Sequence, residues 1–163
     1  MYAIFFVPQF YNIIFNNYAP FISTDKKTVQ KIMSEVSIQD QAIVYELGCG
    51  WSKFLRVVEK DFPTTKVVGI ENLFGLYLVN KIKLYLQKSR IKLLKKDFFT
   101  VNLEIADLIY CYLNNPTMEK LGKKCKEECK PGTHIISRSF SIPQLKPEKV
   151  VIIQNKNIYF YKI

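Results

Sequence analysis

Short apolar runs alternate with longer amphipathic stretches along most of the chain, a pattern that predicts a parallel sheet whose strands are connected by helices. We expect strands in five apolar runs, at residues 42–47, 66–70, 91–94, 108–113 and 134–140. Apolar residues at helical spacing predict helices at residues 51–60, 72–89 and 117–129. Another helix should precede the first strand, with Ser23-Thr24-Asp25 as its N-cap region.

The C-terminal end of the chain changes character. Two apolar runs, 150–154 and 158–162, flank Asn155-Lys156-Asn157 and predict a β-hairpin. The hairpin adds two strands, at least one of them antiparallel. The predicted fold is therefore α/β and Rossmann-like, with a seven-stranded, mostly parallel sheet, a C-terminal antiparallel hairpin and helices on both faces.

The N-terminal segment, residues 1–22, is set apart from the predicted domain, residues 23–163. No charged side chain precedes Asp25, and residues 2–22 are mostly apolar but interrupted by polar residues and prolines. A membrane-spanning helix needs about 20 nearly continuous apolar residues, and a signal peptide needs a basic start. Packing on the domain or a partner is the favoured interpretation, and an interfacial membrane anchor and a true span are the alternatives.

Composition and charge narrow the class of protein. A chain of 163 residues that is 48% hydrophobic is one folded domain. The net charge of +10 indicates an anionic partner, nucleic acid or an acidic membrane surface, or else reflects only a lysine-rich composition. With one histidine and no Cys-x-x-Cys pair, no metal site is expected, and free thiols in a reducing compartment are the simplest interpretation of the four cysteines.

The first predicted strand ends in Glu46-Leu47-Gly48-Cys49-Gly50, which carries the candidate chemistry. A Gly-x-Gly turn lets a backbone approach a ligand closely. The second strand ends in Glu71, about 20 residues after Gly50, where an acid that binds a ribose diol is expected. These features predict a nucleoside-type cofactor. A nicotinamide enzyme is disfavoured because Lys53 stands where a third glycine is expected.

These residues resemble the class I S-adenosylmethionine-dependent methyltransferases. Glu46 to Gly50 are similar to the first motif of that class, Glu71 to its ribose-binding acid, and Asp97-Phe98 to its adenine-side pair. The closing hairpin distinguishes this class from the nicotinamide enzymes. The resemblance implies S-adenosylmethionine as cofactor, with Tyr18, Phe21 and Thr24 closing over it. The cofactor-binding residues it implies are Phe21, Thr24, Glu46, Gly48, Cys49, Gly50, Glu71, Asn72, Asp97 and Phe98.

A narrower resemblance is to a small subfamily of prokaryotic and mitochondrial protein-lysine methyltransferases. The segments 18–24 and 130–137 are similar to that subfamily, whose mitochondrial members act on ATP synthase subunit c and on the adenine nucleotide translocase and carry a hydrophobic anchor. It implies a protein substrate with an acceptor lysine, and a membrane protein is one option for that substrate. We expect a cytoplasmic location, as the free thiols suggest, with the membrane face as one option. The chain departs from its relatives at Trp51, which could narrow the pocket, and at Asp25, often proline in them.

The end of the fourth strand is where this class places the methyl acceptor, and Tyr112, Asn114 and Asn115 are the candidates there. Asn114-Asn115-Pro116 only partly resembles the Asn-Pro-Pro-aromatic signature of amide and amino-purine methyltransferases, so a turn into the next helix is favoured. Three hypotheses follow: a protein-lysine methyltransferase, a nucleic-acid methyltransferase suggested by the charge, and a catalytically silent interaction module. For lysine, no general base is required, because a poorly solvated site lowers the lysine pKa.

Overall fold

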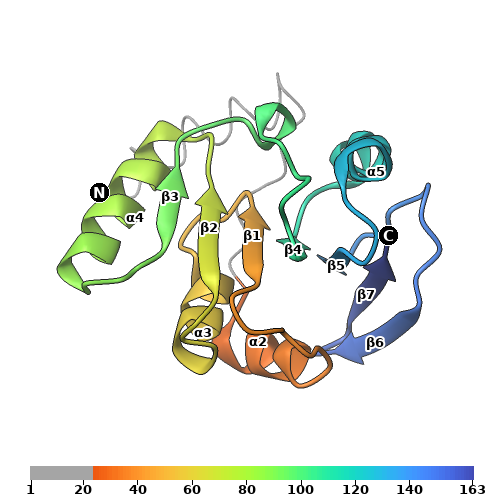
Figure 1. Cartoon of the computed structure of the whole chain (residues 1–163), viewed down its shortest axis with the longest axis horizontal. Coiled ribbons are helices and arrows are strands. Elements are labelled where there is room, and N and C mark those ends of the chain that lie inside the picture. Colours follow the sequence, from red (N-terminus) through yellow and green to blue (C-terminus); the bar gives the residue numbers. More distant parts are fainter. Residues whose placement is uncertain (1–23) are drawn as a thin grey trace.

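The computed structural model describes residues 24–163, which form one seven-stranded sheet in the order β3-β2-β1-β4-β5-β7-β6 (Figure 1). The predictions on residues 1–23, including Tyr18, Phe21 and the separate N-terminal segment, lie outside the described residues. The strands are β1 (Ile43–Leu47), β2 (Lys66–Ile70), β3 (Lys92–Leu94), β4 (Leu108–Cys111), β5 (His134–Arg138), β6 (Lys149–Ile153) and β7 (Lys156–Lys162). β1 to β5 pair in parallel, and β7 runs antiparallel to both β5 and β6. The predicted architecture is therefore confirmed.

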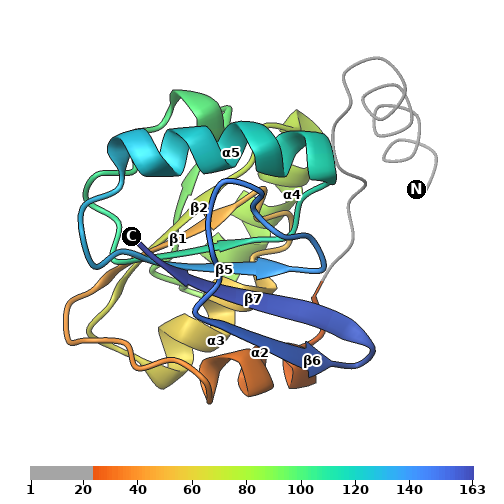
Figure 2. The ribbon, with the colours of Figure 1, turned by 90° about the vertical axis from the view of Figure 1, so that its right-hand side faces the viewer.

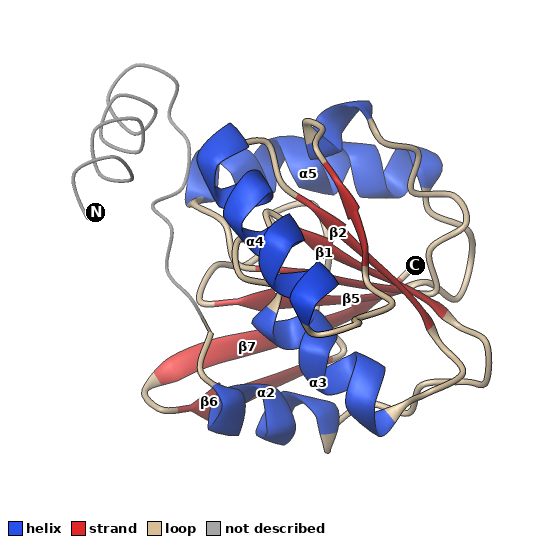
Figure 3. Cartoon of the chain, turned by 90° about the vertical axis from the view of Figure 1, so that its left-hand side faces the viewer, coloured by secondary structure: helices blue, strands red, loops and turns tan. Residues whose placement is uncertain are grey.

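Helices cover both faces of the sheet, as predicted. They are α2 (Lys26–Met33), α3 (Lys53–Asp61), α4 (Phe74–Leu86) and α5 (Asn115–Glu128), with the 3-10 helix η1 (Phe98–Thr100). Figure 2 shows α5 on one face and α2 and α3 on the other. α4 lies at the β3 edge of the sheet (Figures 1 and 3). Because helices cover both faces, the central strands are buried throughout and appear in the sequence as continuous apolar runs.

Several predicted boundaries shift by a few residues, for local reasons. The helix predicted at 72–89 begins at Phe74, because the Leu73 N–H is held by the Glu71 carboxylate. β4 ends at Cys111, because the chain then turns so that Asn114 can cap α5. The hairpin turn is at Gln154 and Asn155, which both have positive φ, whereas it was predicted at 155–157. Two positive-φ residues match the twist of a tight hairpin.

Gly69 of β2 is required where the glycine turn packs on the sheet. A Cβ at this position would lie 2.8 Å from Cys49 Sγ, closer than Cβ atoms approach, and 3.1 Å from Leu93 Cδ1, a tight contact, so these side chains would have to move. Because Gly69 has no side chain, Cys49 in the turn after β1 can pack directly against β2.

We expect Gly69→Val to lower the free energy of unfolding by about 1–3 kcal/mol, because it overpacks this contact. Urea unfolding measures the loss. Lys66→Val, at an exposed position of the same strand, is the control and should stay within about 0.5 kcal/mol. Equal midpoints for the two variants would mean that the turn does not press on β2.

Candidate cofactor and acceptor site

The turn after β1 lies at the carboxyl edge of the sheet, where open α/β folds bind ligands. Gly48 and Gly50 have φ of 67° and 47°, in the left-handed region that glycine adopts without strain. The turn is fixed to the end of β2, because the Cys49 N–H donates to the Ile70 carbonyl at 3.0 Å. Gly48 itself is exposed, so its backbone is open to a ligand.

Glu71 connects this turn to the loop that follows β2. One carboxylate oxygen accepts from the Gly50 N–H at 2.9 Å and the other from the Leu73 N–H at 2.7 Å. The side chain is buried. Burial raises the pKa of the Glu71 carboxyl, and the two backbone hydrogen bonds oppose that rise. Each oxygen has a further lone pair for a diol, so this carboxylate suits the ribose role that the sequence predicts.

Glu46 is a second buried carboxyl, between Gly69 and Tyr110 of the neighbouring strands. The pKa of Glu46 is raised to about 8. Burial is the main cause, a 3.4 Å hydrogen bond from the Leu55 N–H opposes the rise, and the nearby Glu71 adds to it. No ion pair of residues 24–163 involves either acid. A cationic ligand would stabilise the charged forms, and S-adenosylmethionine, with its ammonium and sulfonium, fits that requirement.

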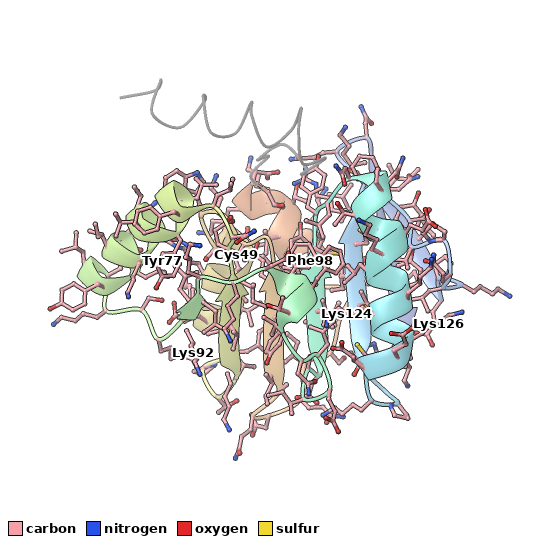
Figure 4. The ribbon with its side chains drawn as sticks, turned by 90° about the horizontal axis from the view of Figure 1, so that it is seen from above. Cys49, Tyr77, Lys92, Phe98, Lys124 and Lys126 are labelled. Atoms are coloured by element: carbon pink, nitrogen blue, oxygen red, sulfur yellow. The ribbon has the colours of Figure 1, made fainter. Side chains whose placement is uncertain are left out.

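Asp97 and Phe98 follow β3 at the same edge of the sheet. Asp97 is half-buried and caps η1, its carboxylate accepting from the Phe99 N–H at 2.9 Å. Phe98 is buried. In the view from above in Figure 4, Phe98 and Cys49 both lie between α4 and α5. The fold therefore brings the predicted adenine-side pair to the edge that carries the glycine turn.

Thr24 connects the start of the described chain to the centre of the sheet. Its hydroxyl lies 2.8 Å from the Tyr110 hydroxyl, and both side chains are buried. The position places Thr24 on the face of the sheet that holds Glu46, consistent with a segment that covers the cofactor. Tyr110 is not predicted as a site residue from the sequence, because a tyrosine within an apolar strand is typical of a core residue.

The three acceptor candidates differ in their surroundings. Tyr112 is half-buried beyond the end of β4, with the Arg138 guanidinium 4.9 Å from its ring centre and the Phe140 ring at 6.5 Å. Asn114 caps α5, its amide oxygen accepting from the Thr117 N–H at 3.2 Å, as the predicted turn into the helix requires. Asn115 is exposed in the first turn of α5.

Two further residues beside the glycine turn, Trp51 and Ser52, contact α4. Trp51 is half-buried and its ring centre lies 5.8 Å from Lys83 Nζ of α4. Ser52 accepts a 2.7 Å hydrogen bond from the buried Asn80 amide, which ties α3 to α4. No local sequence pattern points to Asn80, since its partner Ser52 is 28 residues away along the chain. All four cysteines are buried and free. Burial, and the neighbouring Glu46, raise the pKa of the Cys49 thiol well above its usual range, so it is a neutral packing group.

The sheet order, the antiparallel hairpin and the acids at the ends of β1 and β2 define a class I S-adenosylmethionine-dependent methyltransferase. Residues 46–149 match the family described as the ANTKMT methyltransferase domain, and the chain belongs to that family. A protein-lysine N-methyltransferase from Saccharolobus islandicus is 28% identical over 154 residues, covering 90% of this chain and 94% of its own.

Solved structures agree on the fold. An RNA methyltransferase from Salinibacter ruber, in complex with S-adenosyl-L-homocysteine, superposes with a TM-score of 0.81 at 20% identity, covering 87% of this chain and 94% of its own. A precorrin-6y C5,15-methyltransferase from Geobacter metallireducens superposes with a TM-score of 0.71 at 10% identity, covering 89% and 92%. These neighbours act on unrelated substrates, so the shared fold does not specify the acceptor. Within residues 24–163, no helix is both long enough and apolar enough to cross a membrane.

Proposed function

We propose that the protein transfers a methyl group from S-adenosylmethionine to the amine of a lysine side chain in another protein. The observation that carries this proposal is the match to a protein-lysine N-methyltransferase along 90% of the chain. The aromatic side chains beyond the end of β4 also support it. They make that end of the strand poorly solvated, which favours the neutral lysine amine, so no dedicated general base is required.

In this proposal each residue of the site has a separate role in binding the cofactor or the lysine. When bound, the cofactor supplies a methyl group that its positive sulfur already activates. Glu71 holds the ribose, Glu46 balances the cationic end, and Thr24 and Asp97 border the remaining edges. The packed rings of Tyr112 and Phe140 form one apolar wall beside the lysine and exclude water, which favours the neutral amine. Alignment of the two reactants then supplies most of the rate enhancement.

Label transfer tests this function. The protein is incubated with radiolabelled S-adenosylmethionine and a cell extract, which is then divided between protease and nuclease treatment. We expect label in protein, recovered as methyl-lysine after acid hydrolysis. Label that nuclease releases would establish the nucleic-acid alternative. If S-adenosylhomocysteine binds but nothing is labelled, the catalytically silent module becomes the better account.

A surface on α4 supports a contact with anionic lipid, which we propose as the membrane partner. Its exposed apolar residues repeat along one face of the helix, and we call them the α4 stripe. The α4 stripe consists of Phe74, Leu78, Ile82, Tyr85 and Leu86, which are between 42% and 82% exposed.

The charge around the α4 stripe suits a lipid surface. Between Glu71 and Asp97 the chain has no acidic residue, but it has Lys81, Lys83, Lys88, Lys92, Lys95 and Lys96, and also Arg90, which is paired with Glu59. Tyr77 and Lys92 mark this side of the molecule, around α4 and the β3 edge (Figure 4). A basic helix with an apolar face is typical of an interfacial membrane contact. We therefore propose a cytoplasmic protein that works at a membrane face, with residues 1–22 as a separate second contact.

Vesicle binding tests the α4 stripe. In the full chain, Ile82→Gln together with Leu86→Gln is expected to weaken binding to phosphatidylglycerol-containing vesicles by about tenfold or more, because two apolar side chains no longer insert. Sedimentation with vesicles measures this, and neutral phosphatidylcholine vesicles should bind weakly. Ile152→Gln, at an exposed position of β6, is the matched control. Unchanged binding of the double variant would exclude α4 and leave residues 1–22 as the contact, and preference for RNA over vesicles would favour nucleic acid.

A further inference from the structure

Arg138 is a buried arginine at the end of β5, and two of its nitrogens have no hydrogen-bond partner. Its side chain is 7% exposed, and its Nε and Nη1 atoms are buried with no hydrogen-bond partner. Among the ion pairs of residues 24–163, none involves Arg138. A buried charge without a partner costs several kcal/mol, so this arrangement calls for an anion that completes it.

The surroundings of Arg138 place it at the cofactor and acceptor site. Side chains alternate along β5, so Arg138 is on the same face as Ile136, which packs in the core cluster of Tyr110. The Tyr112 ring lies under its guanidinium, 4.9 Å from the ring centre to Cζ. This stacking fixes the plane of the guanidinium, whose buried Nε and Nη1 atoms keep unused hydrogen-bonding capacity along its edge.

The carboxylate of Asp25 is engaged elsewhere. Its pKa is lowered mainly by a hydrogen bond from the Thr28 side chain, and Arg138 contributes least to that shift. Its two carboxylate oxygens accept from the Thr28 N–H at 3.0 Å and from the Thr28 hydroxyl at 2.6 Å. These bonds hold Asp25 as the N-cap of α2. Asp25 therefore does not satisfy the unpaired nitrogens of Arg138, and a group from outside the described chain is needed.

We propose that Arg138 is the binding site for a carboxylate at this edge of the sheet. A guanidinium fork matches a carboxylate with two parallel hydrogen bonds. The methionine end of the cofactor carries one such carboxylate, and an acidic side chain of the acceptor protein is the other source. Only the second source rests on the proposed protein-lysine function.

Two ligands distinguish the sources by calorimetry. S-adenosylhomocysteine has the carboxylate, and its decarboxylated analogue lacks only that group. In the wild type we expect the first to bind about 10- to 30-fold more tightly, as a charged hydrogen-bonded pair implies. Arg138→Gln should remove this preference while it leaves the affinity for the decarboxylated analogue unchanged. Arg138→Lys, which keeps the charge but not the fork, should retain part of the preference.

The remaining outcomes are also decisive. If Arg138→Gln keeps the preference but raises KM at least tenfold for the acceptor protein found by label transfer, with kcat unchanged, the carboxylate comes from the acceptor. Equal weakening of both ligands would show that Arg138 only supports the fold, and would overturn the proposal. If label transfer finds no acceptor, an unchanged preference in Arg138→Gln overturns it as well. The calorimetric results do not depend on activity, so they separate the cofactor carboxylate from the proposed function, whereas the KM result rests on that function.

Discussion

Glu71→Ala is expected to weaken the binding of S-adenosylhomocysteine by about 100-fold, the largest effect on binding that the structure predicts. The carboxylate holds the Gly50 and Leu73 N–H groups at 2.9 Å and 2.7 Å, and it is also the acid assigned to the ribose diol. Hydrogen bonds to a charged group contribute about 1.5–3 kcal/mol each, so losing the ribose contacts and the geometry of the glycine turn together accounts for about 3 kcal/mol. Isothermal titration calorimetry measures this difference.

Two further variants make the Glu71 result interpretable. Glu71→Gln keeps one acceptor oxygen in place, so we expect an intermediate loss of about tenfold. Glu104→Ala removes an exposed acid remote from the turn and should bind as the wild type does. Circular dichroism confirms that each variant is folded. Unchanged affinity in folded Glu71→Ala would mean that the cofactor does not bind at this edge of the sheet.

The fold could be predicted well because its signals are local. β2 begins and ends at the predicted residues, and the hairpin was recognised from two apolar runs and a polar turn. The position of the hairpin in the sheet could not be predicted. β7 pairs with β5 and carries Tyr161, whose hydroxyl accepts from the Ile142 N–H at 2.8 Å. Nothing in the hairpin sequence specifies which sheet edge it joins, since that depends on contacts made by other segments.

The site residues also fall into two groups, those with a local sequence signal and those that depend on tertiary contacts. The glycine turn, Glu46 and Glu71 could be proposed as site residues from the sequence, because acids and glycines at strand ends are informative wherever the strands are placed. Arg138 and Tyr110 were missed, because their roles depend on tertiary partners. The Thr24–Tyr110 hydrogen bond spans 86 residues of sequence. The sequence does contain one signal for Arg138. Arginine is scarce in this chain, and this arginine lies within an apolar strand.

Glu46→Gln is expected to change how stability depends on pH. In the folded protein the pKa of Glu46 is about 8, because burial disfavours the charged form, whereas an unfolded glutamate titrates at 4.5. Between these two values the folded state keeps a proton that the unfolded state releases. The wild type therefore loses stability as pH rises from about 5 to 8, by up to about 1.4 kcal/mol for each pH unit. Glutamine does not titrate, so Glu46→Gln should not show this loss.

The experiment compares the free energy of unfolding of the wild type and Glu46→Gln at pH 5.5 and pH 8, where all other titrating groups are common to both. We expect the variant to gain about 2–4 kcal/mol relative to the wild type between the two values. The ligand should act in the opposite sense. Because an ammonium beside Glu46 favours its ionised form, S-adenosylhomocysteine should bind the wild type more tightly at pH 8 than at pH 6, and Glu46→Gln should bind it more weakly without that trend. A wild type and a variant with parallel stability profiles would show that Glu46 is already ionised in the folded protein, and would remove the electrostatic reason for a cation at this position.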